Sequence, residues 1–269
     1  MAVLKKYFEF TDRKQIWRLL ISDTNMLVIE TRDVENKQAF FSCYNLENGK
    51  PVFKEFQFEE KFWLGIEEVK DDIIYLHKFA KPDLPWHIGI TAFSINEQKI
   101  LWTNKEMSFL FTVGSEIYSY KNKFDGKDFF ILDSCDGSIK KELGNDAVYV
   151  NKMIEEQRKD FSNYNFPEPF KGSFEDKPIL KKEKEENFIS GDVYYVEKYG
   201  LMFTNYHTAG DDGTLTNIIK VVEIDSEKVI FEEKLNKKLK VYIPDSFFLK
   251  DYYLFVLKEK EKLLVYKIK

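Results

Sequence analysis

The chain contains little cysteine, glycine, proline and histidine. Its 269 residues include 2 Cys, 12 Gly, 7 Pro and 3 His. So few cysteines exclude a disulfide framework and fit a reducing compartment, so we expect the protein in the cytoplasm. The low glycine and proline content argues against a disordered or low-complexity chain. The three histidines and two cysteines form no zinc-ligand spacing, and the sequence therefore predicts neither a metal site nor a cofactor.

An excess of positive charge and a long apolar run are also absent. The chain has 41 basic and 46 acidic residues, a net charge of -5, so nucleic acid is not an expected partner. No window approaches 18 consecutive apolar residues, and the N-terminal residues lack the apolar core of a signal peptide, so no membrane segment is expected. Nucleophile elbows, phosphate loops and dinucleotide fingerprints are missing as well, which disfavours the common enzyme classes that use them.

Aromatic residues and a repeated ten-residue pattern are abundant. Aromatics make up 16% of the chain, with 25 Phe and 15 Tyr, which favours strands over helices. Each copy of the pattern ends an apolar run, turns through small polar residues and begins a second apolar run. The copies are Tyr44–Phe53, Phe93–Trp102, Leu132–Lys141 and Val222–Phe231. A hairpin that returns at a fixed place within larger units predicts a repetitive β architecture.

Period-two alternation divides the chain into units of four strands. Three units precede Gly144, a fourth covers residues 193–233, and the last unit is one strand short. Tyr7–Phe10 belongs to no unit, and its pairing with Leu263–Ile268 would complete the last unit and close a ring. We therefore predict an all-β fold, a five-bladed β-propeller of four-stranded antiparallel blades, with residues 1–269 forming a single domain.

Residues 145–187 interrupt this pattern. They contain a helix-compatible stretch at Asn151–Asp160, two prolines at 167 and 169, and the charged run Lys181–Glu186. The prolines exclude a regular central strand, and the charged run is expected to be solvated. We interpret the segment as an irregular insertion or cap, and the alternative is a sixth, degenerate blade.

The repeated turn resembles the repeat of quinoprotein-type (PQQ-repeat-like) propellers, in which a strand ends Asp-x-x-Thr-Gly-Lys-x-x-Trp. The matching segments are Asn45–Phe53 and Asn96–Trp102, the second with a shortened turn. This resemblance implies a propeller and carries over neither a quinone nor its ligands. The chain is also similar to an uncharacterised bacterial family of unknown function, at Gln15–Trp17 and Leu84–Gly89, which implies no activity.

The candidate binding residues lie where the chain departs from the repeat. Lys81–Gly89 is predicted to be a long loop stiffened by two prolines that presents Trp86 and His87, with His77 in the preceding strand. The alternative is structural: Trp86 packs back onto the sheet and His87 faces solvent. His207 occupies the matching position of the fourth unit.

Charged residues supply the remaining candidates. Gly210–Gly213, which follows His207, is either an ordinary turn or an oxygen-rich cation site, although it lacks the spacing of a calcium loop. Glu67 and Glu68 lie in a first strand, and only one of them can point inward. Arg18 holds a comparable place in the first unit, where it either lines a channel or pairs with that carboxylate.

These observations predict a non-catalytic binding or scaffold module for an unidentified protein or small-molecule ligand. The predicted binding residues are Trp86, His87, His77, His207, Glu67 and Arg18. The alternative is a small-molecule or glycan hydrolase or lyase, in which Arg18, Glu67 and Asp192 would converge from several first strands on a central channel.

Overall fold

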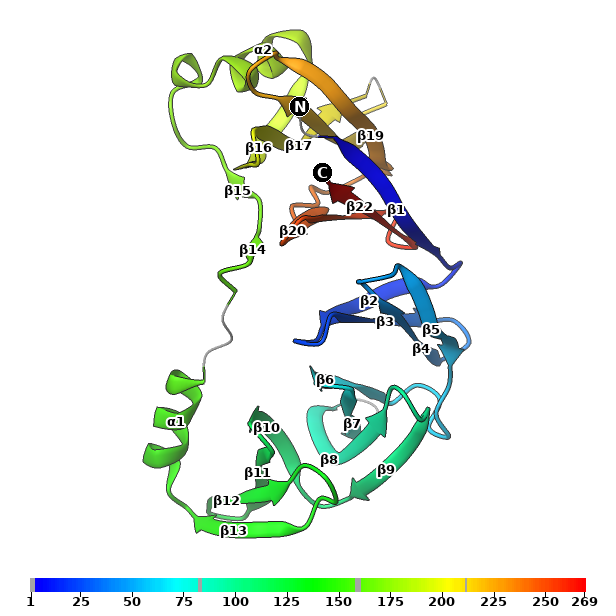
Figure 1. Ribbon diagram of the computed structural model, residues 1–269, viewed down its shortest axis with the longest axis vertical. Coiled ribbons are helices and arrows are strands. Elements are labelled where there is room, and N and C mark those ends of the chain that lie inside the picture. The colour runs from blue at the N-terminus through cyan, green and yellow to red at the C-terminus, as the bar shows by residue number, and fades with distance from the viewer. Residues whose placement is uncertain (1–2, 82–83, 158–160, 211) are drawn as a thin grey trace. The chain divides into compact units, whose positions relative to one another are not determined.

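In the computed structural model, strands dominate the chain (Figure 1). The structure describes residues 3–81, 84–157, 161–210 and 212–269. The strands form five antiparallel sheets of four or five strands each. Two compact units contain these sheets: the central unit, Lys14–Lys159, holds three, and the terminal unit, Met1–Arg13 with Asp160–Lys269, holds two.

Each sheet of the central unit is a meander of four consecutive strands, as the sequence predicts. The first sheet contains β2 (Gln15–Ile21), β3 (Met26–Asp33), β4 (Gln38–Asn45) and β5 (Lys50–Phe56). The second contains β6 (Leu64–Lys70), β7 (Ile73–Lys81), β8 (Leu84–Ser94) and β9 (Lys99–Asn104). The third contains β10 (Ser108–Val113), β11 (Glu116–Lys123), β12 (Gly126–Asp133) and β13 (Ile139–Gly144), and helix α1 (Ala147–Glu156) follows it.

The terminal unit contains two sheets of five strands. One has the order β15 (Glu168–Pro169), β16 (Ile189–Lys198), β17 (Leu201–Ala209), β18 (Leu215–Glu223) and β19 (Lys228–Leu239). The other has the order β1 (Leu4–Thr11), β22 (Lys262–Ile268), β21 (Tyr253–Lys258), β20 (Phe247–Lys250) and β14 (Tyr164–Asn165). A short 3-10 helix, η1 (Phe174–Asp176), and helix α2 (Pro178–Glu186) precede β16.

The repeated pattern forms the hairpin between the third and fourth strands of each central sheet, and between the fourth and fifth strands, β18 and β19, of one terminal sheet. In the first hairpin the Asn45 side chain accepts a hydrogen bond from the backbone N–H of Glu47, and Gly49 has a φ of 69°. Glycine suits this turn because a left-handed backbone costs it nothing. In the third sheet the Asp133 side chain accepts in the same way from Cys135. The residues of these turns therefore determine where one strand ends and the next begins.

The aromatic residue that follows the turn links neighbouring sheets. Trp102, at the end of the second copy, donates its indole N–H to the carbonyl oxygen of Ser134 in the next sheet, at 2.9 Å. A side chain at Gly137 would lie 2.5 Å from the Trp102 ring, so that position admits only glycine. The repeat thus specifies contacts between sheets as well as the hairpin itself.

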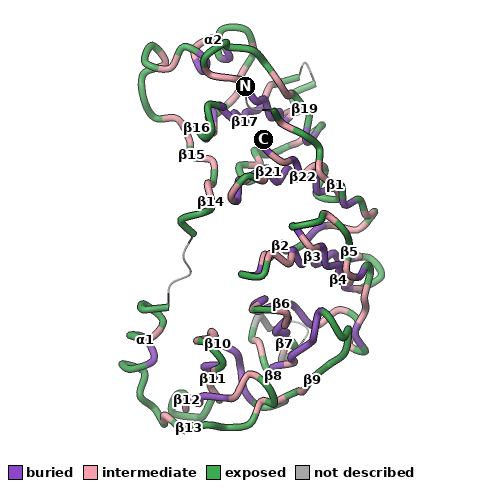
Figure 2. Tube along the Cα trace, viewed as in Figure 1, coloured by how far each residue is buried: buried purple, intermediate pink, exposed green. Residues whose placement is uncertain are grey.

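Apolar residues on both faces of the second sheet join it to its neighbours. The cluster shared with the first sheet includes Val28, Phe41, Phe53, Ile66, Leu76 and Phe93. The cluster shared with the third sheet includes Tyr75, Ile90, Phe109, Ile117 and Leu132. Figure 2 shows these buried positions concentrated in the strands, whereas α1 is largely exposed. Burial of such side chains supplies the main stabilising free energy of the unit.

The N-terminal strand completes the last sheet, which confirms the predicted pairing. Phe8 lies opposite Val265 and Phe10 opposite Leu263 in an antiparallel ladder between β1 and β22. Phe10 is buried, with 4% of its surface exposed. Two segments that are far apart in sequence therefore form one sheet of the terminal unit.

Residues 145–187 differ in part from the prediction. They form two helices, η1 and the two-residue edge strands β14 and β15, which raise two sheets from the predicted four strands to five. Pro169 is tolerated because β15 is an edge strand, where a missing N–H costs little. The helix-compatible stretch forms α1, which ends at Glu156, and residues 158–160 lie outside the described part. No sixth sheet occurs among the described residues.

Two local predictions are wrong. The charged run Lys181–Glu186 is not uniformly solvated, because it lies in α2 and buries Glu183. The alternation also predicts a strand over Tyr242–Leu249, but β20 begins only at Phe247, after Pro244, which cannot donate to a ladder.

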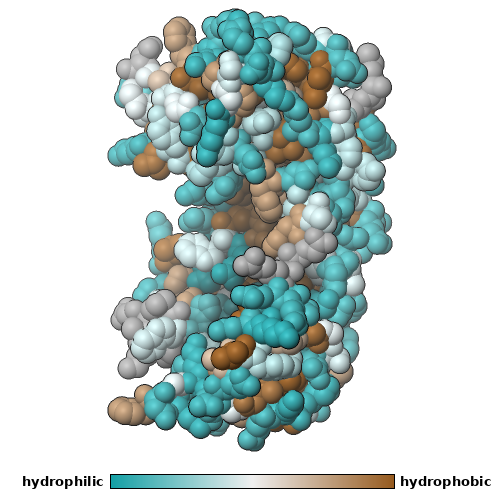
Figure 3. Space-filling view, turned by 90° about the vertical axis from the view of Figure 1, so that its left-hand side faces the viewer, coloured by the Kyte–Doolittle hydropathy of each residue, from teal (hydrophilic) through white to brown (hydrophobic). Residues whose placement is uncertain are grey.

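Hydrophilic side chains prevail on the face displayed in Figure 3, where hydrophobic residues are scattered over both units. In the described part of the chain, no helix combines the length and the apolar character that crossing a membrane requires. Cys43 is buried, Cys135 is exposed, and neither forms a disulfide.

Candidate functional site

Three neighbouring strands of the second sheet carry the candidate site. Glu67 lies on β6, His77 on β7 and His87 on β8. In the sheet register His77 is opposite Gly65 and His87 is opposite Phe79. Because alternate residues of a strand share a face, these pairings place Glu67, His77 and His87 on one face of the sheet.

Two irregularities in the register aim these side chains at one another. The pairing of β6 with β7 shifts between Ile66 and Glu68, so Glu67 is an extra residue of a β-bulge. The pairing of β7 with β8 shifts around His77, opposite a segment in which Gly89 has a φ of 78°. A bulge redirects the side chains around it. The second bulge requires a positive φ, which glycine adopts without strain. The local backbone thus assembles a cluster that uniform strands would not.

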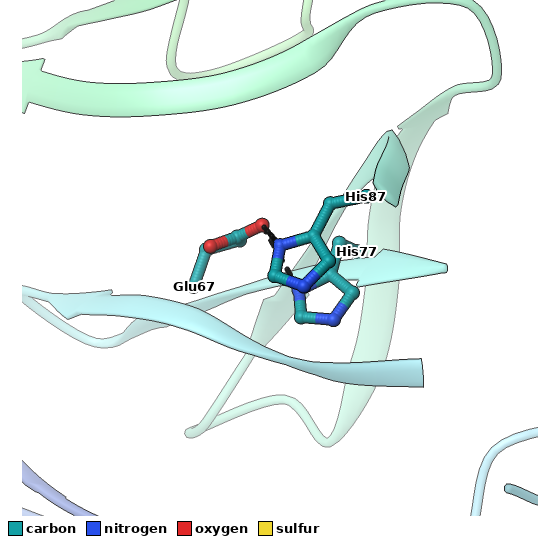
Figure 4. Close-up of side chains that lie close together, drawn as sticks. All are labelled: Glu67, His77 and His87. Atoms are coloured by element: carbon teal, nitrogen blue, oxygen red, sulfur yellow. Dashed lines mark hydrogen bonds and ion pairs between the residues drawn. The ribbon is translucent and has the colours of Figure 1, made fainter. Parts of the chain in front are cut away.

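The imidazole rings of His77 and His87 both contact the same carboxylate oxygen of Glu67 (Figure 4). The Oε1 atom of Glu67 lies 2.7 Å from Nδ1 of His87 and 2.9 Å from Nδ1 of His77. The two imidazole rings are parallel within 7° and their centroids are 3.4 Å apart. The side chain of His77 is 2% exposed, that of Glu67 17% and that of His87 34%. The cluster therefore runs from the interior to the surface.

The electrostatics of the cluster favour an ionised carboxylate beside a neutral buried imidazole. Burial raises the pKa of Glu67, but its favourable interactions with His77 and His87 outweigh this effect, so the net pKa lies below its usual range. Burial lowers the pKa of His77, and the nearby Glu67 opposes this only in part. His77 is therefore uncharged at neutral pH.

Two arginines of the first sheet hold the strand that carries Glu67. Arg18 donates through Nη1 to the carbonyl oxygen of Ile66. Arg32 donates through Nη2 to the carbonyl oxygen of Leu64 at 2.6 Å. Arg18 therefore contacts the backbone beside Glu67 rather than its carboxylate.

A pocket of about 560 Å³ adjoins the cluster, between the second and third sheets of the central unit. The second sheet contributes Glu67, Trp86 and His87 to its lining. The third sheet and its edge contribute Phe109, Tyr120, Asn122, Lys123 and Lys127. Ser108 ties the two sheets together at this place, since its hydroxyl donates to the carbonyl oxygen of His87 at 2.8 Å.

The two lysines of the pocket are held in different ways. Lys123 forms an ion pair with Asp128. The Lys127 ammonium lies 3.9 Å from the centre of the Tyr120 ring, and it has no carboxylate partner among the described residues. Lys127 therefore presents an uncompensated positive charge to the pocket.

Four of the six predicted binding residues lie together in the structure: Glu67, His77, Trp86 and His87. Trp86 and His87 lie within β8 and not in a loop, which corrects the prediction: β7 ends at Lys81 and β8 begins at Leu84, and residues 82 and 83 are outside the described part. Trp86 is 64% exposed, so it does not fold back onto the sheet as the structural alternative required.

His207 belongs to the terminal unit and is buried in a polar network. Its Nε2 atom accepts a hydrogen bond from the backbone N–H of Ile243 at 3.1 Å and lies 3.2 Å from the Asn217 amide nitrogen. Its ring meets Tyr242 edge to face at 5.3 Å. These contacts anchor the segment after β19 to the sheet, which is a structural role.

We expect His207 to make the stability of the protein pH-dependent. Burial lowers its pKa, so the unfolded chain, with a pKa of about 6.5, takes up the proton at higher pH than the folded chain. The stabilisation is complete above about pH 6.5 and is lost as the pH falls toward the folded pKa. Urea unfolding between pH 7.5 and 5.0 measures how steeply the free energy of unfolding depends on pH. In His207→Gln this slope should be smaller by up to about 1.4 kcal/mol per pH unit. An unchanged slope would contradict the assignment.

The remaining candidates lie apart from the cluster in sequence and environment. Asp192 is exposed on β16 of the terminal unit. In the segment Gly210–Gly213, Asp211 is outside the described part, and the Asp212 side chain accepts from the backbone N–H and hydroxyl of Thr214. These bonds belong to an ordinary turn.

Four contributors from the third sheet and its edge were not predicted from the sequence: Tyr120, Asn122, Lys123 and Lys127. The available signal was that the polar residues after Tyr120 continue β11 as far as Lys123, beyond the apolar part of the strand. Polar strand ends carry no core pattern, so alternation alone does not reveal them.

The family model described as a domain of unknown function (DUF4905) matches residues 21–102, a span that is less than half of the chain and contains Glu67, His77, Trp86 and His87. No curated protein matches the chain in sequence. Nothing in these findings is specific to quinoprotein repeats.

Several solved structures resemble the chain at low identity. Hsv2 from Kluyveromyces lactis is 12% identical over 94% of this chain and 74% of its own, with a TM-score of 0.32. An uncharacterised protein from Listeria monocytogenes EGD-e is 11% identical over 93% and 94%, with a TM-score of 0.34. The Dos1 propeller is 11% identical over 94% and 54%, with a TM-score of 0.30. Scores below 0.5 do not establish how the sheets are arranged.

Proposed function

We propose that this chain is a five-bladed β-propeller that binds a small ligand in the pocket between its second and third sheets. Three observations support the propeller. The sheets are antiparallel meanders, the repeated hairpin keeps one phase in four of them, and the N-terminal strand completes the last sheet. A propeller closes its ring in this way, because the added strand removes an exposed edge.

The observation that carries the binding proposal is the composition of the pocket. An exposed Trp86 ring faces a cavity that also holds Lys127, a cation without a carboxylate partner among the described residues. A large exposed aromatic ring is costly in water and suits stacking on a flat apolar surface. A cation beside it suits a carboxylate or phosphate group.

These two features together define the ligand class. We propose a compact ligand with one flat apolar face and one acidic group, such as a sugar acid or sugar phosphate. The Asn122 amide and the His87 imidazole, which also line the pocket, supply donors and acceptors for its hydroxyl groups. The volume of about 560 Å³ is within the range of small-molecule pockets.

A thermal-shift and calorimetric panel of sugar acids, sugar phosphates and the corresponding neutral sugars tests this proposal. We expect an acidic member to bind and its neutral counterpart to bind at least about tenfold more weakly, because the lost charge-assisted hydrogen bond is worth about 1.5 kcal/mol or more. Trp86→Ala and Lys127→Ala should each weaken binding by about tenfold or more.

Lys54→Ala is the matched control, since Lys54 also lies over a tyrosine ring, that of Tyr44, but outside the pocket. It should bind like the unaltered chain. Equal binding by the Lys127 and Lys54 variants, or no binding of any acidic member, would refute the proposed pocket. The panel is run with EDTA present, so that its outcome is independent of metal ions.

A lyase acting on the same ligand class is the second candidate function. The observation that favours it is the hydrogen bond between Glu67 and His87, because a carboxylate that orients an imidazole is a common general-base arrangement. The described pocket lining has one carboxylate, whereas glycoside hydrolysis ordinarily uses two, so proton abstraction next to an acidic group fits better than hydrolysis. Recovery of the bound ligand unchanged after long incubation would exclude this activity.

A further inference from the structure

The cluster of Glu67, His77 and His87 has metal-ligand chemistry that goes beyond the proposed binding of an acidic small molecule, which uses only His87 of the three. Two imidazole nitrogens and one carboxylate oxygen lie within 4.8 Å of one another. We propose that these three side chains bind a divalent first-row transition-metal ion through Nδ1 of each histidine and Oε1 of Glu67. Binding of the ion requires no organic ligand.

The buried His77 of the cluster is poorly satisfied as a hydrogen-bonding group. His77 is buried, yet neither of its ring nitrogens has a well-aligned hydrogen bond among the described residues, although Nδ1 lies 2.9 Å from Glu67. An unsatisfied buried polar atom costs about 1–3 kcal/mol. A fold that retains such a group, aimed at a carboxylate and a second imidazole, is suited to binding an ion through these atoms.

The distances within the cluster are close to those between ligands of one ion. Two atoms that are each about 2.1 Å from a metal ion and subtend a right angle at it are about 3 Å apart. The two oxygen–nitrogen separations here are 2.7 and 2.9 Å. A turn of His87 that keeps these separations would bring the three atoms to adjacent positions of an octahedron, as in sites with two histidines and one carboxylate on a single face of the ion.

The backbone is adapted to this cluster. A bulge in the first strand of a sheet recurs in β2 and β10, where the extra residues are Trp17 and Leu110. Among these three first strands of the central unit, only β6 carries a charged residue in its bulge. On the far side of His77, a Cβ atom at Gly65 would lie 3.0 Å from the imidazole ring, so glycine leaves room for the ring in its present place.

The stacked rings impose one requirement on binding. A metal ion lies close to the plane of each imidazole that binds it, because the nitrogen lone pair is in that plane. The rings are parallel and 3.4 Å apart, so one ion cannot lie in both planes. His87 must turn when the ion binds; it is one-third exposed and borders the pocket, whereas His77 is enclosed. The pocket also supplies an entry path and room for water on the open positions.

The ligand set predicts the selectivity of the site. Imidazole nitrogen suits Zn²⁺, Co²⁺ and related ions, whereas Mg²⁺ and Ca²⁺ prefer oxygen ligands. We therefore expect Co²⁺ and Zn²⁺ to bind with one ion per chain and a large excess of Mg²⁺ or Ca²⁺ not to displace them.

The experiment uses the full chain, stripped with EDTA and then freed of it, without any organic ligand. Co²⁺ binding is followed by visible absorption and Zn²⁺ binding by calorimetry, with circular dichroism to verify folding. His87→Ala and Glu67→Gln should each weaken binding by about 100-fold or more, since even loss of an outer partner costs about 10- to 100-fold. Glu68→Gln is the matched control, because the neighbouring carboxylate accepts from Thr112 and belongs to no part of the cluster.

The Gly65→Ala variant distinguishes metal binding at this cluster from adventitious metal binding by an exposed histidine. Its new methyl group displaces the His77 ring and should weaken metal binding in a chain that keeps all three ligands. Less than one bound ion per chain at saturation, or equal affinities for the unaltered chain and the His87→Ala and Glu67→Gln variants, would overturn the proposal and leave a proton-sharing cluster only.

Discussion

Glu183→Gln is expected to destabilise the protein by about 3 kcal/mol. Glu183 is buried in α2, where its Oε2 atom lies 2.7 Å from the Lys220 ammonium and accepts from the Tyr206 hydroxyl at 3.0 Å. Glutamine keeps an acceptor but leaves Lys220 as a buried cation without its partner, which typically costs about 3–5 kcal/mol. We expect the lower end of this range, because Glu232 lies 3.7 Å from Lys220 and is half exposed.

Urea unfolding followed by far-UV circular dichroism measures this effect. Glu186→Gln, an exposed change of the same kind on the same helix, is the control and should stay within about 0.5 kcal/mol. The double variant Glu183→Gln with Lys220→Met should recover much of the loss, since it leaves no unpaired charge. A single variant as stable as the control would show that the pair does not hold α2 to the sheet.

Removal of residues 1–11 should abolish the cooperative folding of the terminal unit. These residues supply β1, which pairs with β22 from Leu4 to Thr11. Their loss leaves β22 as an open edge and uncovers apolar residues such as Leu263 and Val265, both fully buried in the intact sheet. The loss of stability should approach the whole folding free energy of a domain, on the order of 5–15 kcal/mol.

A smaller change keeps this prediction testable if the truncated chain aggregates. Phe10→Ala removes the buried ring of β1 and should cost about 3–5 kcal/mol, whereas Lys5→Ala on the exposed side should cost about 0.5 kcal/mol or less. A synthetic peptide of residues 3–13 added to the truncated chain should restore folding. A truncated chain that unfolds like the intact one would contradict the role of β1.

Strand pairing within the repeat was predictable because local chemistry determines it. Alternating apolar residues and the turns at Asn45–Gly49 and Asp133–Gly137 place most strands within a few residues of their observed bounds. The partner of Tyr7–Phe10 was also predictable, because the last unit lacked one strand. These features depend on neighbours in sequence or on a simple count of strands.

Residues 145–187 were predicted less well because tertiary contacts decide their structure. The run Lys181–Glu186 resembles any solvated charged segment, and nothing in it marks Glu183 as buried. Its burial depends on Lys220 and Tyr206 of a sheet that follows in the chain. A buried charge is stable only beside its partner, so the sequence of the helix alone carries no signal for it.

The site was predicted as a set of residues but not as a geometry. Trp86, His87, His77 and Glu67 were singled out, yet the spacing of the histidines indicated no common centre. Two register shifts bring the side chains together, and such shifts leave only a weak trace in sequence, here Gly89. Lys127 was missed because it belongs to the next sheet.

The proposed ligand site is the pocket beside Glu67 and His87. A crystal structure of the chain with the tightest-binding acidic sugar of the panel would show whether the ligand occupies it. We expect the flat face of the ligand to lie against Trp86 and its acidic group to lie within hydrogen-bonding distance of the Lys127 ammonium. Ligand bound elsewhere on the chain, with this pocket filled only by water, would refute the proposed site.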